Sequence, residues 1–291
     1  MLTSVLVLPF WISIGALSLA QGALVAIPGH RPRVMLTRLR GRRWAAIPPL
    51  SVIGFVFVAR AAEHASAQGL TYLALVAVPL LAALALGWLG AAARARPVRA
   101  LLILPLFALA WLDRGGLAGE GAAFVLSALS CVALGVLFAA VTPPRWLAVG
   151  IVAMAVADTA LVASDLLQRP NDALNAAHPV AGLPRLQSAV FGSAVMGYGD
   201  LFVAALLGAL LAVTAGRRSQ RHAAALAALL GLGFDLLFFL VDELPATVPV
   251  ALTLVVVVLR RRRPSRRRAA RAVALPARRA PARPARAPAG R

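Results

Sequence analysis

The stretch MGYGDLFVAALL, residues 196–207, places an aspartate, Asp200, at the head of a strongly apolar run. A second aspartate, Asp158, lies within the preceding apolar run. An ionisable side chain in hydrocarbon costs about 2.5–3.5 kcal/mol on insertion scales, so such residues usually serve a function. Two carboxyl groups on neighbouring helices can share one proton, which is the chemistry of an aspartyl protease. Asp158 and Asp200 are therefore the candidate catalytic pair.

The composition indicates an all-α membrane protein. Hydrophobic residues make up 61% of the 291 residues and the mean hydropathy is +0.84, against roughly 45–50% apolar residues in soluble domains. The one cysteine, Cys131, excludes a disulfide within the chain. The four histidines are scattered and form no His-Glu-x-x-His pair, so we expect no metal site and no cofactor.

Nine apolar segments predict about nine transmembrane helices. Most of them can cross about 30 Å of hydrocarbon as helices of about 20 residues. We expect a polytopic membrane domain over residues 1–259, with its catalytic half at about 146–259. The predicted spans are 4–27, 44–60, 70–93, 97–112, 121–141, 146–168, 188–214, 223–241 and 245–259.

The arginines predict the orientation of these spans. With nine spans, 26 of the 30 arginines fall on one side of the membrane and four on the other. The positive-inside rule then places the N-terminus outside and the C-terminus in the cytoplasm. All basic residues are arginine and alanine is abundant, which suggests a bacterial genome of high GC content. We therefore expect a multi-pass protein of the bacterial inner (plasma) membrane.

The C-terminal segment 260–291 consists mainly of arginine, proline and alanine. It lacks the large apolar residues that a folded core requires, so it is predicted to be a disordered cytoplasmic tail. Its partners are expected to be anionic lipid headgroups, at about 1 kcal/mol per basic residue near the surface. Nucleic acid is not expected as a partner, because no folded recognition module accompanies the charge.

The expected depths of the two aspartates are compatible with contact between them. Asp158 is ten residues from the outer end of the predicted sixth span, about 15 Å deep at the helical rise. Asp200 lies about 12 residues into the seventh span if that helix starts near Ser188, and about 9 Å deep if the crossing starts near Ala194. Gly197 and Gly199 remove side chains beside Asp200 and allow backbone to approach a substrate. Two further aspartates within spans, Asp165 and Asp235, are not needed by a two-carboxyl mechanism.

These motifs resemble those of the presenilin and signal peptide peptidase family of intramembrane aspartyl proteases. Residues 196–207 look like the Gly-x-Gly-Asp segment of that family, and Asp158 stands where its partner aspartate is found, after Ala157 instead of tyrosine. The sequence Pro245-Ala246-Thr247 occupies the place of a Pro-Ala-Leu motif, and Gly231-Leu232-Gly233 resembles a further family feature. The resemblance covers roughly residues 146–259.

The resemblance implies a presenilin-like bundle that hydrolyses peptide bonds within transmembrane helices, such as remnant signal peptides. It implies a catalytic pair of Asp158 and Asp200. Its implied substrate-binding residues are Gly197, Tyr198, Gly199, Pro245 and Ala246. Because proline lacks an N–H, a strand edge near Pro245 and Ala246 could hold the unwound substrate by strand addition. The alternative is ordinary helix initiation at Pro245 after the Asp242-Glu243 turn, which the local sequence by itself favours.

Two alternatives remain open. Prepilin peptidases also use Gly-x-Gly-Asp, although Phe202 and Val203 stand where their basic residue is expected. The other alternative is a non-catalytic membrane protein, such as a proton-coupled transporter in which Asp158, Asp200 and Asp235 form a proton path. Asp235 favours the transporter, whereas the absence of an evident internal repeat counts against it.

Overall fold

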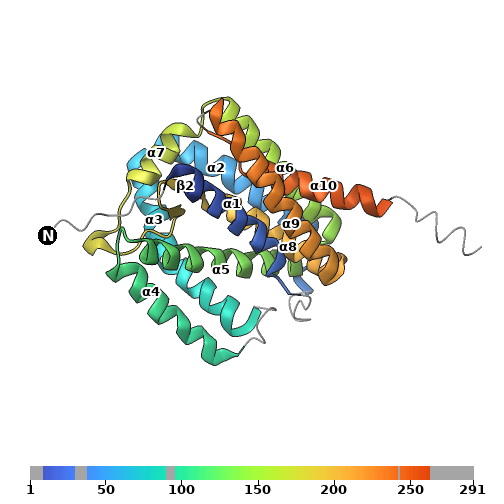
Figure 1. The fold of residues 1–291 in the computed structure, drawn as a ribbon, viewed down its shortest axis with the longest axis horizontal. Coiled ribbons are helices and arrows are strands. Elements are labelled where there is room, and N and C mark those ends of the chain that lie inside the picture. Colours follow the sequence, from blue (N-terminus) through green and yellow to red (C-terminus); the bar gives the residue numbers. More distant parts are fainter. Residues whose placement is uncertain (1–8, 30–37, 90–95, 242, 263–291) are drawn as a thin grey trace, which may run out of the picture. The chain divides into compact units, whose positions relative to one another are not determined.

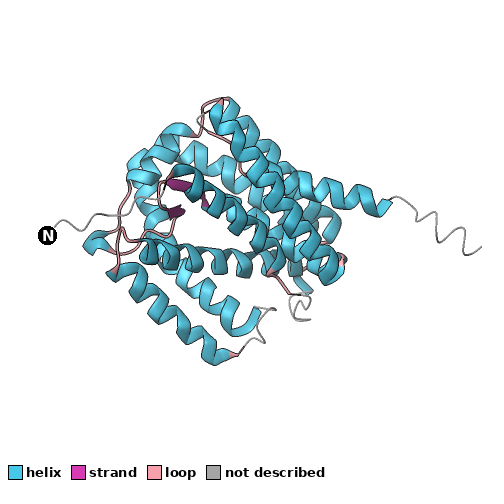
Figure 2. Ribbon diagram, in the orientation of Figure 1, coloured by secondary structure: helices cyan, strands magenta, loops and turns pink. Residues whose placement is uncertain are grey.

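The computed structural model describes residues 9–29, 38–89, 96–241 and 243–262. These residues are mostly helical, with one β-hairpin among the helices (Figures 1 and 2). Short 3₁₀ turns precede α2 and α4, and a π-helical stretch, Ala85–Leu89, continues α3. The elements are α1 Phe10–Ala26, α2 Ile47–Ala61, α3 Glu63–Leu84, α4 Ile103–Leu112, α5 Leu117–Val141, α6 Pro144–Ala163, α7 Gln168–Ala176, β1 Ser188–Phe191, β2 Ala194–Gly197, α8 Tyr198–Thr214, α9 Gly216–Asp235 and α10 Val248–Arg262.

Each of the nine predicted apolar segments contains a helix. Within the described residues, five helical stretches are long and apolar enough to cross a membrane, namely Arg42–Ala61, Glu63–Leu89, Leu117–Val141, Pro144–Ala163 and Gly216–Phe239. Shorter apolar helices are found at Phe10–Ala26, Pro97–Leu112 and Tyr198–Thr214. Large apolar side chains such as Phe57, Leu80 and Leu229 are exposed on the surface of these helices. This combination is typical of a membrane protein.

The predicted seventh span, 188–214, is not one helix, and the all-α prediction is wrong at this point. Residues 188–197 form an antiparallel hairpin in which Ser188 is opposite Gly197 and Phe191 is opposite Ala194. Gly192 has a φ of +60°, which suits the first position of the two-residue turn that joins the strands. The helix therefore begins only at Tyr198, and Asp200 lies in its first turn instead of deep within it.

Other predicted boundaries also shift. The sixth span ends at Ala163, and a separate short helix, α7, follows it. Helix α9 begins at Gly216, so three arginines expected in a loop lie on its first turns. Gly216 has a φ of +76°, which allows α8 and α9 to be joined almost without a loop. Helix α10 extends to Arg262, and residues 263–291 of the predicted tail lie outside the described residues.

Helix α8 is enclosed by other parts of the protein. All residues from Leu201 to Ala212 are buried, and the helix packs against α1, α5, α6 and α9. A helix that is apolar on every face is suited to such a central position. The surrounding helices therefore determine where the first turn of α8, with Asp200, is held.

Small residues bring the neighbouring backbones close to α8. A Cβ added at Gly135 of α5 would lie 2.8 Å from the carbonyl oxygen of Ala205, and one added at Gly208 would lie 2.5 Å from that of Val25. Close approach of backbones at small residues is a common way for helices to associate where lipid removes the hydrophobic driving force. These contacts determine the register of α8 against α5 and the end of α1.

A buried amide ties three of these segments together. Gln220 of α9 is fully buried. Its Nε2 donates to the carbonyl oxygens of Val25 at 2.9 Å, Pro28 at 3.0 Å and Gly208 at 3.1 Å. The side chain thus joins the start of α9 to the end of α1 and to the middle of α8.

We expect Gly135→Ala to destabilise the protein and Gly69→Ala to leave it unharmed. The added methyl group at position 135 meets backbone of α8, which cannot move aside without shifting the helix, so the cost should be about 1–3 kcal/mol. Gly69 of α3 has no atom within 4 Å of an added Cβ, and alanine is the better helix former by about 1 kcal/mol. Thermal unfolding in detergent measures both variants. Equal unfolding temperatures would contradict the close packing of α5 on α8.

Candidate active site

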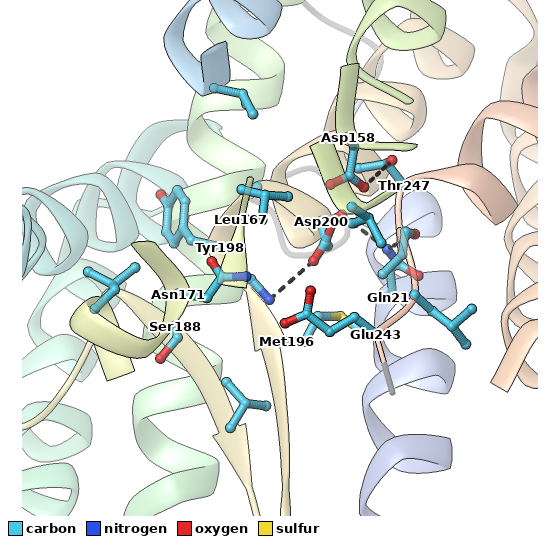
Figure 3. A pocket seen from close by; sticks show the side chains of 18 of the residues that line it. Gln21, Asp158, Leu167, Asn171, Ser188, Met196, Tyr198, Asp200, Glu243 and Thr247 are labelled. Atoms are coloured by element: carbon cyan, nitrogen blue, oxygen red, sulfur yellow. Dashed lines mark hydrogen bonds between the residues drawn. The ribbon is translucent and has the colours of Figure 1, made fainter. Parts of the chain in front are cut away.

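A cavity of about 540 Å³ lies beside the start of α8. Its walls come from α1, α2, α3, α6, α7, the hairpin, α8, α9, the segment before α10 and the first turn of α10. Asp158 and Asp200 both line it, and Figure 3 shows their side chains next to each other. The two carboxyl groups lie close enough to interact electrostatically. The structure therefore brings together the two residues that the sequence singles out.

Asp200 is oriented by the helix that it begins. It is the third residue of α8, and its Oδ2 accepts a hydrogen bond from the backbone N–H of Gly197 at 3.1 Å. An acidic side chain at this position satisfies an otherwise unpaired N–H and interacts favourably with the positive end of the helix dipole. One oxygen of the carboxyl group is thus held in place by its own helix terminus.

Asp158 is oriented by a residue 89 positions further along the chain. The Thr247 hydroxyl donates to Asp158 Oδ2 at 2.6 Å (Figure 3). Asp158 lies on α6, whereas Thr247 directly precedes α10. A hydrogen bond to an ionised group contributes more than one between neutral partners, about 1.5–3 kcal/mol. Thr247, the residue that replaces leucine in the expected motif, therefore positions one of the two carboxyl groups.

Gln21 connects the two halves of the site. Its Nε2 donates to the backbone carbonyl of Asp200 at 3.2 Å and to that of Ala246 at 2.9 Å. The side chain is 3% exposed and also lines the cavity. A single amide on α1 thus holds the first turn of α8 against the segment that carries Thr247.

The two glycines beside Asp200 differ in what they permit. A Cβ at Gly197 would lie 3.0 Å from Asp200 Oδ2, so this glycine leaves room for the carboxyl group. A Cβ at Gly199 would have no atom within 4 Å. Both residues line the cavity. Gly197 is therefore tied to the geometry of Asp200, while Gly199 keeps the space beside it open.

Tyr198 is held by α5. Its hydroxyl lies 2.7 Å from Ser130 Oγ, and the Cys131 thiol donates to its backbone carbonyl at 3.8 Å. The ring lines the cavity but lies away from the two aspartates (Figure 3). Tyr198 thus anchors the start of α8 to α5, and its hydroxyl is already engaged there.

The strand edge expected near Pro245 and Ala246 is not found there. Residues 243–247 contain no strand, the Pro245 carbonyl accepts the Val248 N–H at 3.1 Å, and the Ala246 carbonyl is occupied by Gln21. Ala246 lines the cavity, whereas Pro245 is not among its lining residues. The strand beside the aspartates is β2, because the turn at Gly192 folds residues 188–197 back on themselves before α8 begins.

The two other aspartates predicted within spans, Asp165 and Asp235, differ in their relation to the cavity. Asp165 follows the end of α6 with a φ of +51° and is not among the lining residues of the cavity. Asp235, at the end of α9, does line the cavity. Its Oδ1 accepts a hydrogen bond from the Ser18 hydroxyl at 3.1 Å, and its Oδ2 is buried without a partner among the described residues.

Sequence reasoning missed two residues of the site, Gln21 and Thr247. Both carried a signal, because a polar side chain within or beside an apolar span requires a partner. The sequence could not name those partners, which lie up to 225 positions away. Among the described residues, no group of three histidine, cysteine or acidic side chains could hold a metal ion.

Comparisons of this chain with known proteins identify no relative. No family model, no curated protein and no solved structure matches this chain. The function therefore has to be argued from the site itself.

Proposed function

We propose that this chain is an aspartic intramembrane endopeptidase that hydrolyses peptide bonds within transmembrane helices, such as remnant signal peptides. The observation that carries the proposal is the pair of carboxyl groups of Asp158 and Asp200 in one cavity, each with an oxygen held by a neighbouring donor. Fixed orientation of both groups is what general acid–base catalysis on a water molecule demands.

The chemistry needs one proton shared between the two aspartates. The ionised carboxylate removes a proton from water, whose oxygen attacks the scissile carbonyl carbon, while the protonated partner donates to the carbonyl oxygen. In the tetrahedral gem-diol the C–N bond breaks as the amine nitrogen takes the proton from the newly protonated aspartate. The other aspartate takes a proton from a hydroxyl group of the intermediate, which leaves a carboxylic acid and restores the pair to one proton. Thr247 and Gly197 donate to opposite members of the pair, so each carboxyl group keeps its position while the proton moves.

A substrate helix must unwind to expose a peptide bond, and β2 offers it a new hydrogen-bonding partner. Val195, Met196 and Gly197 of this strand line the cavity, directly before the turn with Asp200. Strand β2 pairs with β1 on one side only in this two-stranded sheet. On its other edge the Gly197 N–H is already taken by Asp200, so strand addition there would use the backbone of Val195 to satisfy an unwound substrate, and Gly199 leaves space beside it.

Nine spans, in a presenilin-like bundle, complete the proposal. In that arrangement every tryptophan lies at a helix end, as expected for the two interfacial belts of a membrane protein. Two stand at the outer ends of spans and three at the inner ends: Trp11 and Trp111 outside, and Trp44, Trp88 and Trp146 inside. At the outer end, Trp11 also stacks on Phe239 with the ring centroids 4.4 Å apart.

The same topology places the N-terminus outside and the C-terminus in the cytoplasm of a bacterial inner membrane. It follows from the excess of arginine on one side. The basic tail then faces the cytoplasmic leaflet, where anionic lipid headgroups attract it.

One observation favours a second function, proton-coupled transport. Asp235 lines the same cavity as the catalytic pair, and one of its oxygens is buried without a partner among the described residues. A chain of intramembrane carboxyl groups is typical of proton paths. The hydrogen bond from Ser18 holds Asp235 on the wall formed by α1 and α9, and proteolysis does not need it. Cleavage by the purified protein decides between the two functions.

We expect Asp158→Asn and Asp200→Asn each to abolish cleavage of a model transmembrane helix by the purified protein. A lone carboxyl group has no partner with which to share a proton, and an amide can neither accept nor donate it in the required way. Asparagine at position 200 can still accept the Gly197 N–H through its carbonyl oxygen, so the fold should persist. Gel-based detection of the two product peptides measures the activity, and thermal unfolding measures the fold.

Asp165→Asn is the matched control for both variants. Asparagine tolerates the left-handed conformation found at this position, and the residue does not line the cavity, so activity should be retained. Asp235→Asn should also retain most activity. If Asp200→Asn cleaves as fast as the parent protein, the protease function is wrong. If the parent cleaves no helix, transport becomes the better proposal.

We expect Thr247→Val to lower kcat/KM about 10- to 100-fold, which corresponds to the loss of one hydrogen bond to a charged group. Thr247→Ser keeps the hydroxyl that donates to Asp158 and should restore most of the activity. Valine matches threonine in shape, so Thr247→Val should unfold at a temperature similar to that of the parent protein. Equal kinetics for valine and serine would show that this hydroxyl does not position Asp158.

Thiol labelling tests both the water-filled cavity and the orientation. Cys131 is fully buried and should not react. Val195 lines the cavity and is 48% exposed, whereas Leu229 of α9 is 68% exposed but is not among the lining residues. A charged, membrane-impermeant reagent added to intact cells should modify Val195→Cys and spare Leu229→Cys, which faces lipid. Equal reaction of the two would contradict the membrane arrangement, and reaction only from the cytoplasmic side would reverse the orientation.

A further inference from the structure

The turn of the hairpin is held by side chains from two different helices. Gly192 and Ser193 form the two-residue turn between β1 and β2. The N–H of Gly192 donates to Glu120 Oε2 of α5 at 2.7 Å, and the N–H of Ser193 donates to Ser13 Oγ of α1 at 3.2 Å. In a two-residue turn these two N–H groups are not used by the ladder between the strands. The two hydrogen bonds therefore fasten the hairpin to the surrounding helices.

Glu120 does not cap the helix that carries it. An acidic residue in the first turn of a helix often binds one of the N–H groups that the helix leaves unpaired. In α5 the N–H of Gly119 is bound by Asp113 Oδ2 at 2.9 Å, and the N–H of Glu120 itself donates to the carbonyl oxygen of Gly116 at 3.0 Å. The Glu120 carboxyl group instead binds a turn that lies 72 positions further along the chain.

The same helix fastens the open end of the hairpin. Ser127 Oγ donates to the carbonyl oxygen of Leu186, just before β1, at 3.3 Å, and Ser130 Oγ lies 2.7 Å from the hydroxyl of Tyr198, directly after β2. Glu120, Ser127 and Ser130 are seven and three residues apart, so they lie on one face of α5. From Glu120 to Ser130 this face spans about 15 Å, which matches strands of four residues at about 3.4 Å each. Helix α5 therefore holds the hairpin at both of its ends.

Holding the hairpin at both ends fixes Val195, whose backbone would pair with an unwound substrate. Val195 lines the cavity and is two residues from Ser193, whose N–H is bound by Ser13. A substrate strand paired with Val195 moves relative to Asp200 whenever the turn moves. A displacement of about 3.3 Å along the strand brings the next peptide bond to the two aspartates. The turn therefore has to stay in place if one particular bond is to be cleaved.

We propose that Glu120 is a positioning residue for proteolysis: by holding the hairpin turn it determines which peptide bond of the substrate meets Asp158 and Asp200. The inference rests on the proposed protease function and on strand addition to β2. Glu120 is not among the lining residues of the cavity, so it acts through the hairpin and not on the substrate itself. Ser13 supports the same turn from α1.

The position of the cleaved bond tests this role, and mass spectrometry of the products from a model transmembrane helix measures it. We expect the parent protein to cleave mainly one bond. Glu120→Met keeps the length of the side chain but removes the carboxyl acceptor. Loss of one hydrogen bond to a charged group shifts an equilibrium about tenfold, so products from neighbouring bonds should rise about tenfold relative to the main product. Glu120→Gln keeps an acceptor oxygen and should give the parental products.

Two further variants complete the test. Ser13→Ala removes the acceptor of the other turn N–H and should shift the products in the same direction. Glu63→Met makes the same replacement in the first turn of α3, away from the cavity, and should give the parental products.

The possible failures are distinguishable. If the parent protein cleaves and folded Glu120→Met gives the parental products, the role of Glu120 is overturned while the protease function stands. Should Glu120→Met not fold, parental products from Ser13→Ala would overturn the turn as the element that selects the bond. If the parent protein cleaves no helix, the protease function is overturned, and the role of Glu120 with it.

Discussion

The position of Asp200 depends on the enclosure of α8. Twelve consecutive residues of this helix are buried, and glycines at positions 135 and 208 bring the backbones of α5 and α1 against it. Since a helix held this closely cannot slide or rotate freely, its first turn occupies one place relative to the rest of the protein. Asp200 in that turn, with Gly197 as its donor, inherits the position. Helix packing therefore sets the position of one of the two proposed catalytic groups.

The site is completed by segments far outside the half of the chain that carries the recognisable motifs. Gln21 on α1 joins Asp200 to Ala246, across 179 and 225 positions of sequence. Thr247 joins the start of α10 to Asp158 across 89 positions. Residues of α2 and α3 also line the cavity. Residues outside the predicted segment 146–259 therefore also position the two aspartates, because Gln21 of α1 holds the first turn of α8.

The lining of the cavity is acidic, although the chain as a whole is strongly basic. The protein carries a net charge of +20, yet the described lining of the cavity contains five acidic residues and no basic one. In surroundings of low dielectric constant, these carboxyl groups favour positively charged groups inside the cavity over negatively charged ones. The clustered carboxyl groups also explain why a proton path is the natural competing function.

The sequence by itself determined the helical membrane character, the nine apolar segments that each contain a helix, and the choice of Asp158 and Asp200. These follow from local composition and from the cost of placing a carboxyl group in hydrocarbon, which act at the level of single segments. Only the tertiary structure decided that residues 188–197 form a hairpin, that Tyr198 is bound to Ser130 of α5, and that Gln21 and Thr247 belong to the site. The hairpin escaped prediction because short apolar runs suit helix and strand equally. The other features escaped because each is a hydrogen bond between residues that only packing brings together.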